Sequence, residues 1–282
     1  MEMVRLDVDN VQDFEEYLTP DMTENIGRIF FRGIVLKNEE QIQGGMVWEY
    51  RNTAIEDKKE SHIVFLRIKS EEAADALLDE YKDQIGRENI AVSKVNLPAK
   101  AGSLEKKILK EKGFKIFLDE GDEIVATLSE IAAIDFIHKV KPSDKVRPLV
   151  TASQRGLTTS IRRFLSMGKS GVTEDIAYLP RSYFENDISM YIEDEGIITG
   201  LFLFHRCPSG RIKIILMATL NKESVKILPS MMAAAFNAAM LIYSAETEVV
   251  INRHNYATLA LGEKLFPRSF GIPVYTGSRP EN

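Results

Sequence analysis

The chain has 282 residues, of which 44% are hydrophobic and 28% are charged, values typical of a globular protein. Its 42 acidic and 36 basic residues give a formal net charge of -6, which argues against a protein that binds polyanions through its overall charge. This composition excludes a disordered or collagen-like chain, and the length is sufficient for one large domain or for two smaller ones.

Cysteine and histidine are sparse. The single cysteine, Cys207, excludes an intramolecular disulfide, and the four scattered histidines show no metal-ligand spacing, so no metal site is predicted. The acidic N-terminal segment lacks the apolar core of a signal peptide, which predicts a cytoplasmic protein. Residues 227–243 form the longest apolar stretch, and Pro229 interrupts it. This stretch predicts a buried helix rather than a membrane span.

The two halves of the chain show the same order of predicted elements. In the first half these are strands 33–36, 45–50 and 63–68, a long helix 71–85, a strand 90–95, a helix 103–112 that Gly113 ends, and a hairpin of strands 114–118 and 123–128. In the second half they are strands 189–192, 197–205 and 211–219, a long helix 223–243, a strand 248–251, a helix 256–265 and a final strand 272–275. Gly45 and Gly200 are predicted to be equivalent. The repeat predicts two domains, 1–130 and 131–282.

A basic segment, residues 139–163, separates the two halves. It has seven basic residues and one acidic residue, and its prolines predict a connector that leads into a helix capped by Thr158 or Thr159. A solvated linker with a basic helix face is one interpretation. An anion site formed by Arg155, Arg162 and Arg163 is the other. Nucleic-acid binding has little support, because no aromatic residues are interleaved with the basic ones.

The repeated order of strand hairpin, strand, long helix, strand, helix and strand resembles the GNAT superfamily of acyl-CoA N-acyltransferases. Local matches are the Lys110-Glu-Lys-Gly-Phe114 helix end and the segment from Asn255 through Glu263-Lys-Leu-Phe266. The resemblance covers about 187–276 in the second half and, less closely, about 28–128 in the first. It implies an α/β (α+β) chain of two GNAT-like domains. Each would hold a mixed, mostly antiparallel twisted sheet flanked by helices.

The same resemblance implies a site for acetyl-CoA or another acyl-CoA at the start of the long helix. There, backbone N–H groups would hold the pyrophosphate. The first-half loop carries Glu71 and Glu72, which would repel it, so the second half is the expected ligand site and the first half the expected scaffold. The residues that would contact the cofactor in the second half are Met217, Thr219, Lys222, Ser224, Lys226 and Asn255. For Asn255, a helix cap is the favoured alternative.

The sequence departs from the family pattern at the loops expected to bind the pyrophosphate and at the position of the family's tyrosine. Neither loop, 69–76 or 219–226, contains a glycine, and the family's tyrosine position is occupied by Leu109 and Gly262. The candidate catalytic residues are His205, His254 and Tyr256, although a structural role at a loop boundary is the favoured interpretation of the two histidines.

Two hypotheses follow. The first is an acyltransferase that acts on a small amine, and the second is a non-catalytic protein of the same fold that binds a small ligand or a partner.

Overall fold

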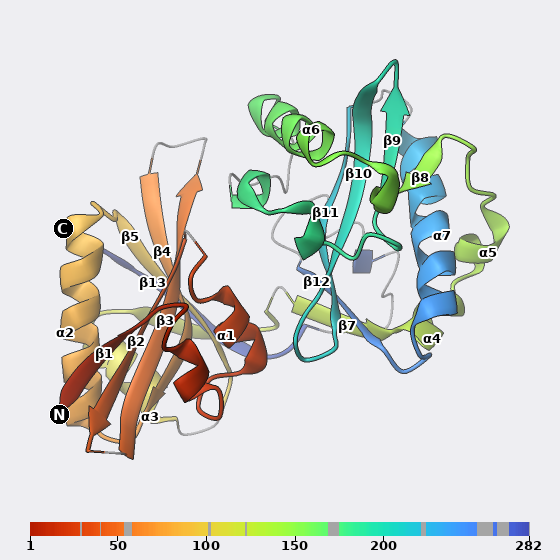
Figure 1. The fold of residues 1–282 in the computed structure, drawn as a ribbon. Coiled ribbons are helices and arrows are strands. Elements are labelled where there is room, and N and C mark those ends of the chain that lie inside the picture. Colours follow the sequence, from red (N-terminus) through yellow and green to blue (C-terminus); the bar gives the residue numbers. More distant parts are fainter. Residues whose placement is uncertain are drawn as a thin grey trace. The chain divides into compact units, whose positions relative to one another are not determined.

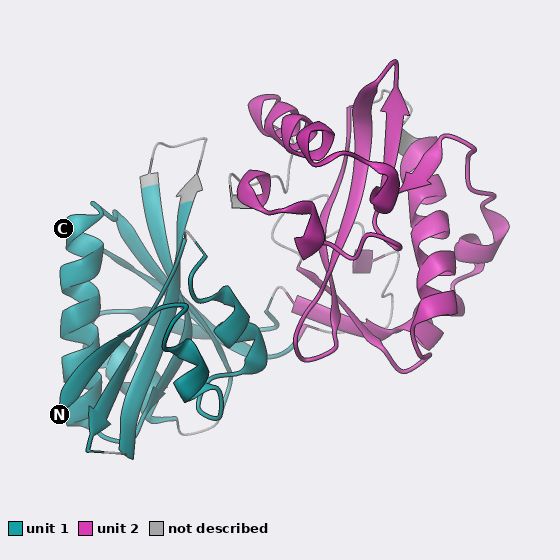
Figure 2. Ribbon diagram, viewed as in Figure 1, with its two compact units in different colours: residues 1–121, 272–282 teal, residues 122–271 magenta. Residues whose placement is uncertain are grey.

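The computed structural model describes residues 1–281 except 29, 40, 54–57, 101–102, 122, 169–174, 221–223, 253–261 and 264–270. The chain forms two compact units (Figures 1 and 2): unit 1 is Met1–Gly121 with Ile272–Asn282, and unit 2 is Asp122–Gly271. Each unit has one sheet with helices packed on it. The mixed, mostly antiparallel sheets agree with the fold class predicted from the sequence.

Unit 1 contains a seven-stranded sheet with the order β1-β2-β3-β4-β5-β13-β6, in which only the described pair β4–β5 is parallel. Its strands are β1 (Glu2–Leu6), β2 (Phe31–Asn38), β3 (Gln41–Thr53), β4 (Lys58–Ile68), β5 (Val92–Pro98), β6 (Lys115–Asp119) and β13 (Val274–Pro280). Its helices are η1 (Val11–Phe14), α1 (Pro20–Asn25), α2 (Glu71–Arg87) and α3 (Leu104–Glu111). The helices α2 and α3 cover one face and the short helices η1 and α1 cover the other.

Unit 2 contains a six-stranded sheet with the order β7-β12-β11-β10-β9-β8, in which only the described pair β11–β12 is parallel. Its strands are β7 (Glu123–Thr127), β8 (Val146–Pro148), β9 (Met190–Asp194), β10 (Ile197–Arg206), β11 (Ile212–Thr219) and β12 (Glu248–Asn252). Its helices are α4 (Leu128–Ala132), α5 (Asp135–Lys139), α6 (Gln154–Ser166) and α7 (Ser224–Ile242), with 3-10 turns η2 (Leu149–Thr151), η3 (Asp175–Tyr178) and η4 (Arg181–Tyr183). The core of one face includes α4, α5 and α7, and that of the other includes α6.

Local sequence explains most of these elements. Ser70 caps α2 by accepting the Ala73 N–H, and the apolar residues of this helix recur at helical spacing on its buried face. The β9–β10 hairpin turns on Glu195 and Gly196, which both have positive φ angles, as a two-residue turn of this kind requires. The helix predicted at 223–243 is α7, and no helix in the described part of the chain is long and apolar enough to cross a membrane.

Two strands lie in the opposite unit from the one predicted. The predicted hairpin of 114–118 with 123–128 does not form, because β6 pairs with β13 in unit 1 whereas β7 pairs with β12 in unit 2. The final strand of the second half, β13, is inserted between β5 and β6 of unit 1. The division at 130/131 therefore differs from the structure, in which the chain leaves unit 1 after Gly121 and returns at Ile272. An alternating apolar strand specifies a buried face but not the sheet to which it belongs.

The segment predicted as a basic connector is part of unit 2. Residues 139–163 contribute the end of α5, the edge strand β8 and most of α6. The helix begins earlier than predicted, because Ser153, rather than Thr158 or Thr159, caps it by accepting the Gly156 N–H at 3.0 Å. Pro148 ends β8 instead of marking a flexible link.

A polar cluster lies on the sheet of unit 1, close to where β4 and β5 separate. The Nε2 atom of His62 lies 3.0 Å from Glu60 Oε2, and Lys94 Nζ lies 2.7 Å from the same oxygen. Burial, together with the positive charge of Arg51, lowers the pKa of the His62 imidazole from 6.5 to about 3. The imidazole is therefore neutral at physiological pH.

This lowered pKa predicts a loss of stability in mild acid. Because the unfolded chain binds a proton near pH 6.5 and the folded chain does not, His62 stabilises unit 1 fully above pH 6.5 and progressively less as the pH falls toward 3. We expect the free energy of unfolding of unit 1 to fall by about 1.5 kcal/mol between pH 6.5 and pH 5. Urea titrations followed by the fluorescence of Trp48, the only tryptophan, measure this change. His62→Gln is the control, and an equal loss in that variant would contradict the assignment.

Candidate functional site

In unit 2, strands β11 and β12 separate next to a β-bulge, and their ladder ends at Lys213. Leu203 of β10 pairs with Leu216 and Phe204 pairs with Ile214, so Ile215 of β11 is the extra, bulged residue. The parallel ladder of β11 with β12 contains only the pairs Ile212–Val249 and Lys213–Val250. A bulge bends its strand and ends regular pairing, so among the described residues the remainder of β11 has no partner strand on the side of β12.

Unit 1 has the same bulge. Val47 of β3 pairs with Phe65 and Trp48 pairs with Ile63, so Val64 is the extra residue of β4, and the β4–β5 ladder ends at Ile63. The two bulges align the halves of the chain residue by residue.

This alignment corrects the predicted glycine pair, because Gly200 corresponds to Gly44 and not to Gly45. Both glycines face the long helix of their unit. A Cβ atom on Gly44 would lie 2.8 Å from Leu77 of α2, and one on Gly200 would lie 3.2 Å from Met231 of α7. Gly45 faces the opposite side of its sheet, toward Tyr17.

In unit 1, side chains of the protein bridge the space beyond the bulge. The carboxylate of Glu105, at the start of α3, accepts the backbone N–H of Ile68 at 3.4 Å. Close by, Lys107 of α3 donates to Glu71 of α2 at 2.6 Å and so joins the first turns of the two helices. The strand edge and the helix start that a cofactor would need are thus engaged within unit 1.

In unit 2, the first turn of α7 follows the open end of β11 after a short loop. This turn contains no acidic residue, in contrast to α2, whose first turn contains Glu71 and Glu72. Lys226 lies in it and is exposed. The partial positive charge of the helix N-terminus is therefore not offset by a carboxylate of its own first turn.

Of the residues predicted to contact a cofactor, two lie on β11 beyond the bulge. Met217 is partly buried against the core under α7, and the Thr219 hydroxyl donates to the Thr199 carbonyl at 3.1 Å. Ser224 is the first residue of α7. Lys222 and Asn255 lie outside the described residues.

Of the predicted catalytic residues, only His205 is described. It is buried, its ring stacks on Tyr183 with the centroids 3.8 Å apart, and its Nδ1 atom lies 2.7 Å from the Tyr183 carbonyl oxygen. In the β10–β11 ladder, His205 pairs with Lys213. Lys213 precedes the bulge and still pairs with Val250 of β12, so His205 does not lie where the two strands separate. His254 and Tyr256 lie outside the described residues. In the described part of the chain, no group of histidine, cysteine or acidic side chains could hold a metal ion.

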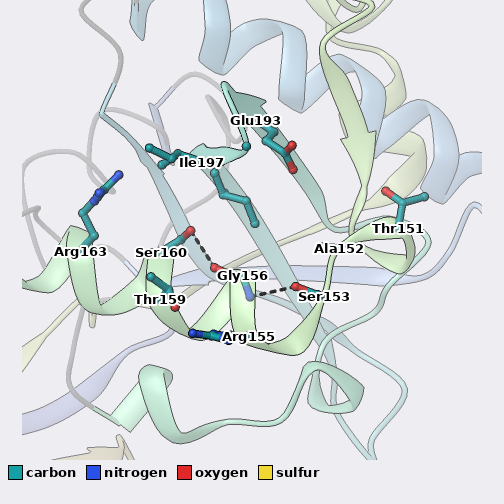
Figure 3. A pocket seen from close by; sticks show the side chains of 12 residues that line it. Thr151, Ala152, Ser153, Arg155, Gly156, Thr159, Ser160, Arg163, Glu193 and Ile197 are labelled. Atoms are coloured by element: carbon teal, nitrogen blue, oxygen red, sulfur yellow. Dashed lines mark hydrogen bonds between the residues drawn. The ribbon is translucent and has the colours of Figure 1, made fainter.

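The sequence missed the features that define this site. The bulge has no sequence signal, because Ile215 lies within the continuous apolar run 214–218. The contact of Glu105 with Ile68 joins residues 37 positions apart, which no local pattern indicates. Of the three arginines predicted to form an anion site, Arg155 and Arg163 line a pocket between α6 and the β9–β10 hairpin, where they point to different sides, and Arg162 does not line it (Figure 3).

The chain is similar to solved structures of GNAT acyltransferases over nearly its whole length. A tandem GNAT protein from the clavulanic acid biosynthesis pathway matches with a TM-score of 0.62 and 10% identity, over 99% of this chain and 98% of the other. A GCN5-related N-acetyltransferase from Anabaena variabilis ATCC 29413 matches with a TM-score of 0.55 and 15% identity, over 100% of this chain and 73% of the other. FemX matches with a TM-score of 0.51 and 12% identity, over 98% and 97% of the two chains.

No protein-family model matches the chain, and no curated protein does. The similarity to solved structures, together with the bulge and the separated parallel strands in both units, nevertheless defines the class of fold. The chain has the tandem GNAT fold, as the order of its elements predicted.

Proposed function

We propose that the protein is an acyl-CoA-dependent N-acyltransferase that acts on a small amine, with its site in unit 2 between β11 and β12. One contrast carries this proposal. The two units share the bulge and the separated strands, but protein side chains bridge the space in unit 1, whereas in unit 2 the first turn of α7 carries no acid and exposes Lys226. Unit 1 is then the scaffold.

The residues of unit 2 fit such a substrate. The backbone N–H groups at the start of α7 would face the pyrophosphate, and Lys226 would add a positive charge there. Beyond Ile215, the edge of β11 would offer N–H and C=O groups to the pantetheine arm, and an N–H group to the thioester carbonyl. The thioester supplies the acyl group that is transferred to the amine. Acetyl-CoA is the simplest such substrate.

The alternative is a protein of the same fold that binds a small ligand or a partner without catalysis. Two observations favour it. Neither helix-start loop contains a glycine, and the only described candidate base, His205, is buried against Tyr183 before the bulge. Both functions include ligand binding, but only the acyltransferase transfers an acyl group. Measurement of turnover therefore distinguishes them.

Calorimetric titration of acetyl-CoA into the full chain tests the proposed site. We expect micromolar affinity, and we expect Lys226→Glu to weaken it by at least about tenfold, since a charge-assisted contact to phosphate contributes about 1.5–3 kcal/mol. Lys82→Glu makes the same change of charge on the exposed face of α2 and is the matched control.

Equal weakening by both variants would mean a general effect of charge, and the absence of binding would contradict the proposal. Release of free thiol from acetyl-CoA in the presence of a panel of small amines reports turnover. Binding without turnover would favour the non-catalytic alternative.

A further inference from the structure

Strand β6 forms one edge of the sheet of unit 1. It is the last strand in the order of this sheet, and among the described residues it pairs only with β13. In an antiparallel sheet, alternate residues of an edge strand direct their N–H and C=O groups away from the neighbouring strand. These groups of β6 are therefore available to a further strand.

The side chains of β6 are exposed on both faces of the sheet. All residues of this strand except Ile116 are exposed. Phe117 is 58% exposed and its neighbour Leu118 is 64% exposed, and successive side chains of a strand point to opposite faces. Natural proteins protect such an edge with proline, charge or a covering element. An apolar edge that is open on both faces is typical of a strand that pairs with another chain.

The other edge strands of the two sheets are protected. In β1, Leu6 is buried and the other apolar residues are partly buried. In β7, Ile124 and Ala126 are buried and the apolar residue between them is partly buried. Strand β8 has three residues and ends at Pro148. Among the edge strands that the structure describes, β6 alone exposes large apolar side chains.

The sequence of β6, Lys115-Ile-Phe-Leu-Asp119, is complementary to itself. In an antiparallel pair of two copies centred on Phe117, Lys115 lies opposite Asp119 of the second copy, and Ile116 lies opposite Leu118 of the second copy. Two-fold symmetry forms each of these contacts twice. Within the described chain neither Lys115 nor Asp119 forms an ion pair, and the Asp119 carboxylate accepts the N–H of the next residue at 2.8 Å.

We propose that β6 pairs antiparallel with β6 of a second copy of this chain, centred on Phe117, so that two unit 1 sheets join into one. Opposite charges and apolar side chains that face each other across two strands stabilise the pair. The contact uses the same surface on both copies, so it closes after two copies and forms a dimer rather than a fibre. This association goes beyond the proposed acyl transfer and does not depend on it.

Sedimentation of the full chain over a range of concentrations tests this inference. We expect the mass to rise from 31.9 kDa to twice that value. The dissociation constant should be on the order of 10–100 µM, because one pair of short strands buries less area than a standard interface. As the dimer forms, backbone amides of residues 115–119 should exchange with solvent more slowly, whereas those of β1 should not change. A chain that stays monomeric, or a dimer without protection of β6, would overturn the inference.

Reversal of the two charges tests the register. Lys115→Asp and Asp119→Lys each place like charges opposite each other at two positions, so each should weaken self-association by at least about tenfold. An equimolar mixture of the two variants should associate like the wild type, because every pair again has opposite charges. Lys82→Asp makes the same change of charge on the exposed face of α2 and should have no effect.

Both reversed residues are exposed, so each variant should unfold at the wild-type urea concentration when followed by Trp48 fluorescence. Self-association that both reversals leave unchanged would contradict pairing through β6. A mixture that stays monomeric where the wild type dimerises would contradict the register centred on Phe117.

Discussion

Replacing Gly277 with alanine is expected to lower the free energy of unfolding of unit 1 by about 3 kcal/mol, at the upper end of the usual cost of overpacking. Gly277 lies in β13, between β5 and β6, and a Cβ atom there would lie 2.3 Å from the Lys115 carbonyl oxygen. The contact is with backbone, so the substitution can be accommodated only by displacing β6. Urea unfolding followed by Trp48 fluorescence measures the loss.

Gly86→Ala is the matched control for this substitution. Gly86 lies on α2 with no atom within 4 Å of a built Cβ, so alanine there should stabilise unit 1 by about 0.5–1 kcal/mol through its higher helix propensity. If Gly277→Ala unfolded at the wild-type urea concentration, β13 would not be an interior strand of unit 1, and the exchange of strands between the two units would be wrong.

Phe236→Ala is expected to cost unit 2 about 4 kcal/mol, through lost burial and the cavity left behind. Phe236 of α7 is fully buried, and its ring centroid lies 6.0 Å from that of Phe202 and 5.7 Å from that of Phe204. Hydrogen exchange of peptides from β10 and β11 measures the loss. Because the core that contains Phe236 belongs entirely to unit 2, the Trp48 transition should be unchanged.

Leu241→Ala serves as the control, because Leu241 lies on the same helix and is 88% exposed, so its truncation should change stability by less than about 0.5 kcal/mol. A Phe236→Ala variant that exchanged like the wild type would contradict the position of α7 in the core. An equal shift of the Trp48 transition would contradict two separate cores.

The sequence alone determined the order of the main elements, because their local signals are strong. The amphipathic spacing and the Ser70 cap of α2, the glycine turn of the β9–β10 hairpin and the apolar length of α7 each arise within a few residues. This order was sufficient to indicate a tandem GNAT fold. The edge strands β1 and β8, by contrast, were not predicted; β8 has only three residues and so carries little periodicity.

Only the tertiary structure decided which strands share a sheet and where a ligand can bind. Strand β13 completes unit 1 although it follows the second half in sequence, because pairing with β5 and β6 depends on contacts across more than 150 residues. The bulge at Ile215, the Glu105–Ile68 contact and the pocket between Arg155 and Glu193 likewise depend on distant segments. Sequence periodicity records which face of an element is buried, whereas a site is made by elements that meet only after folding.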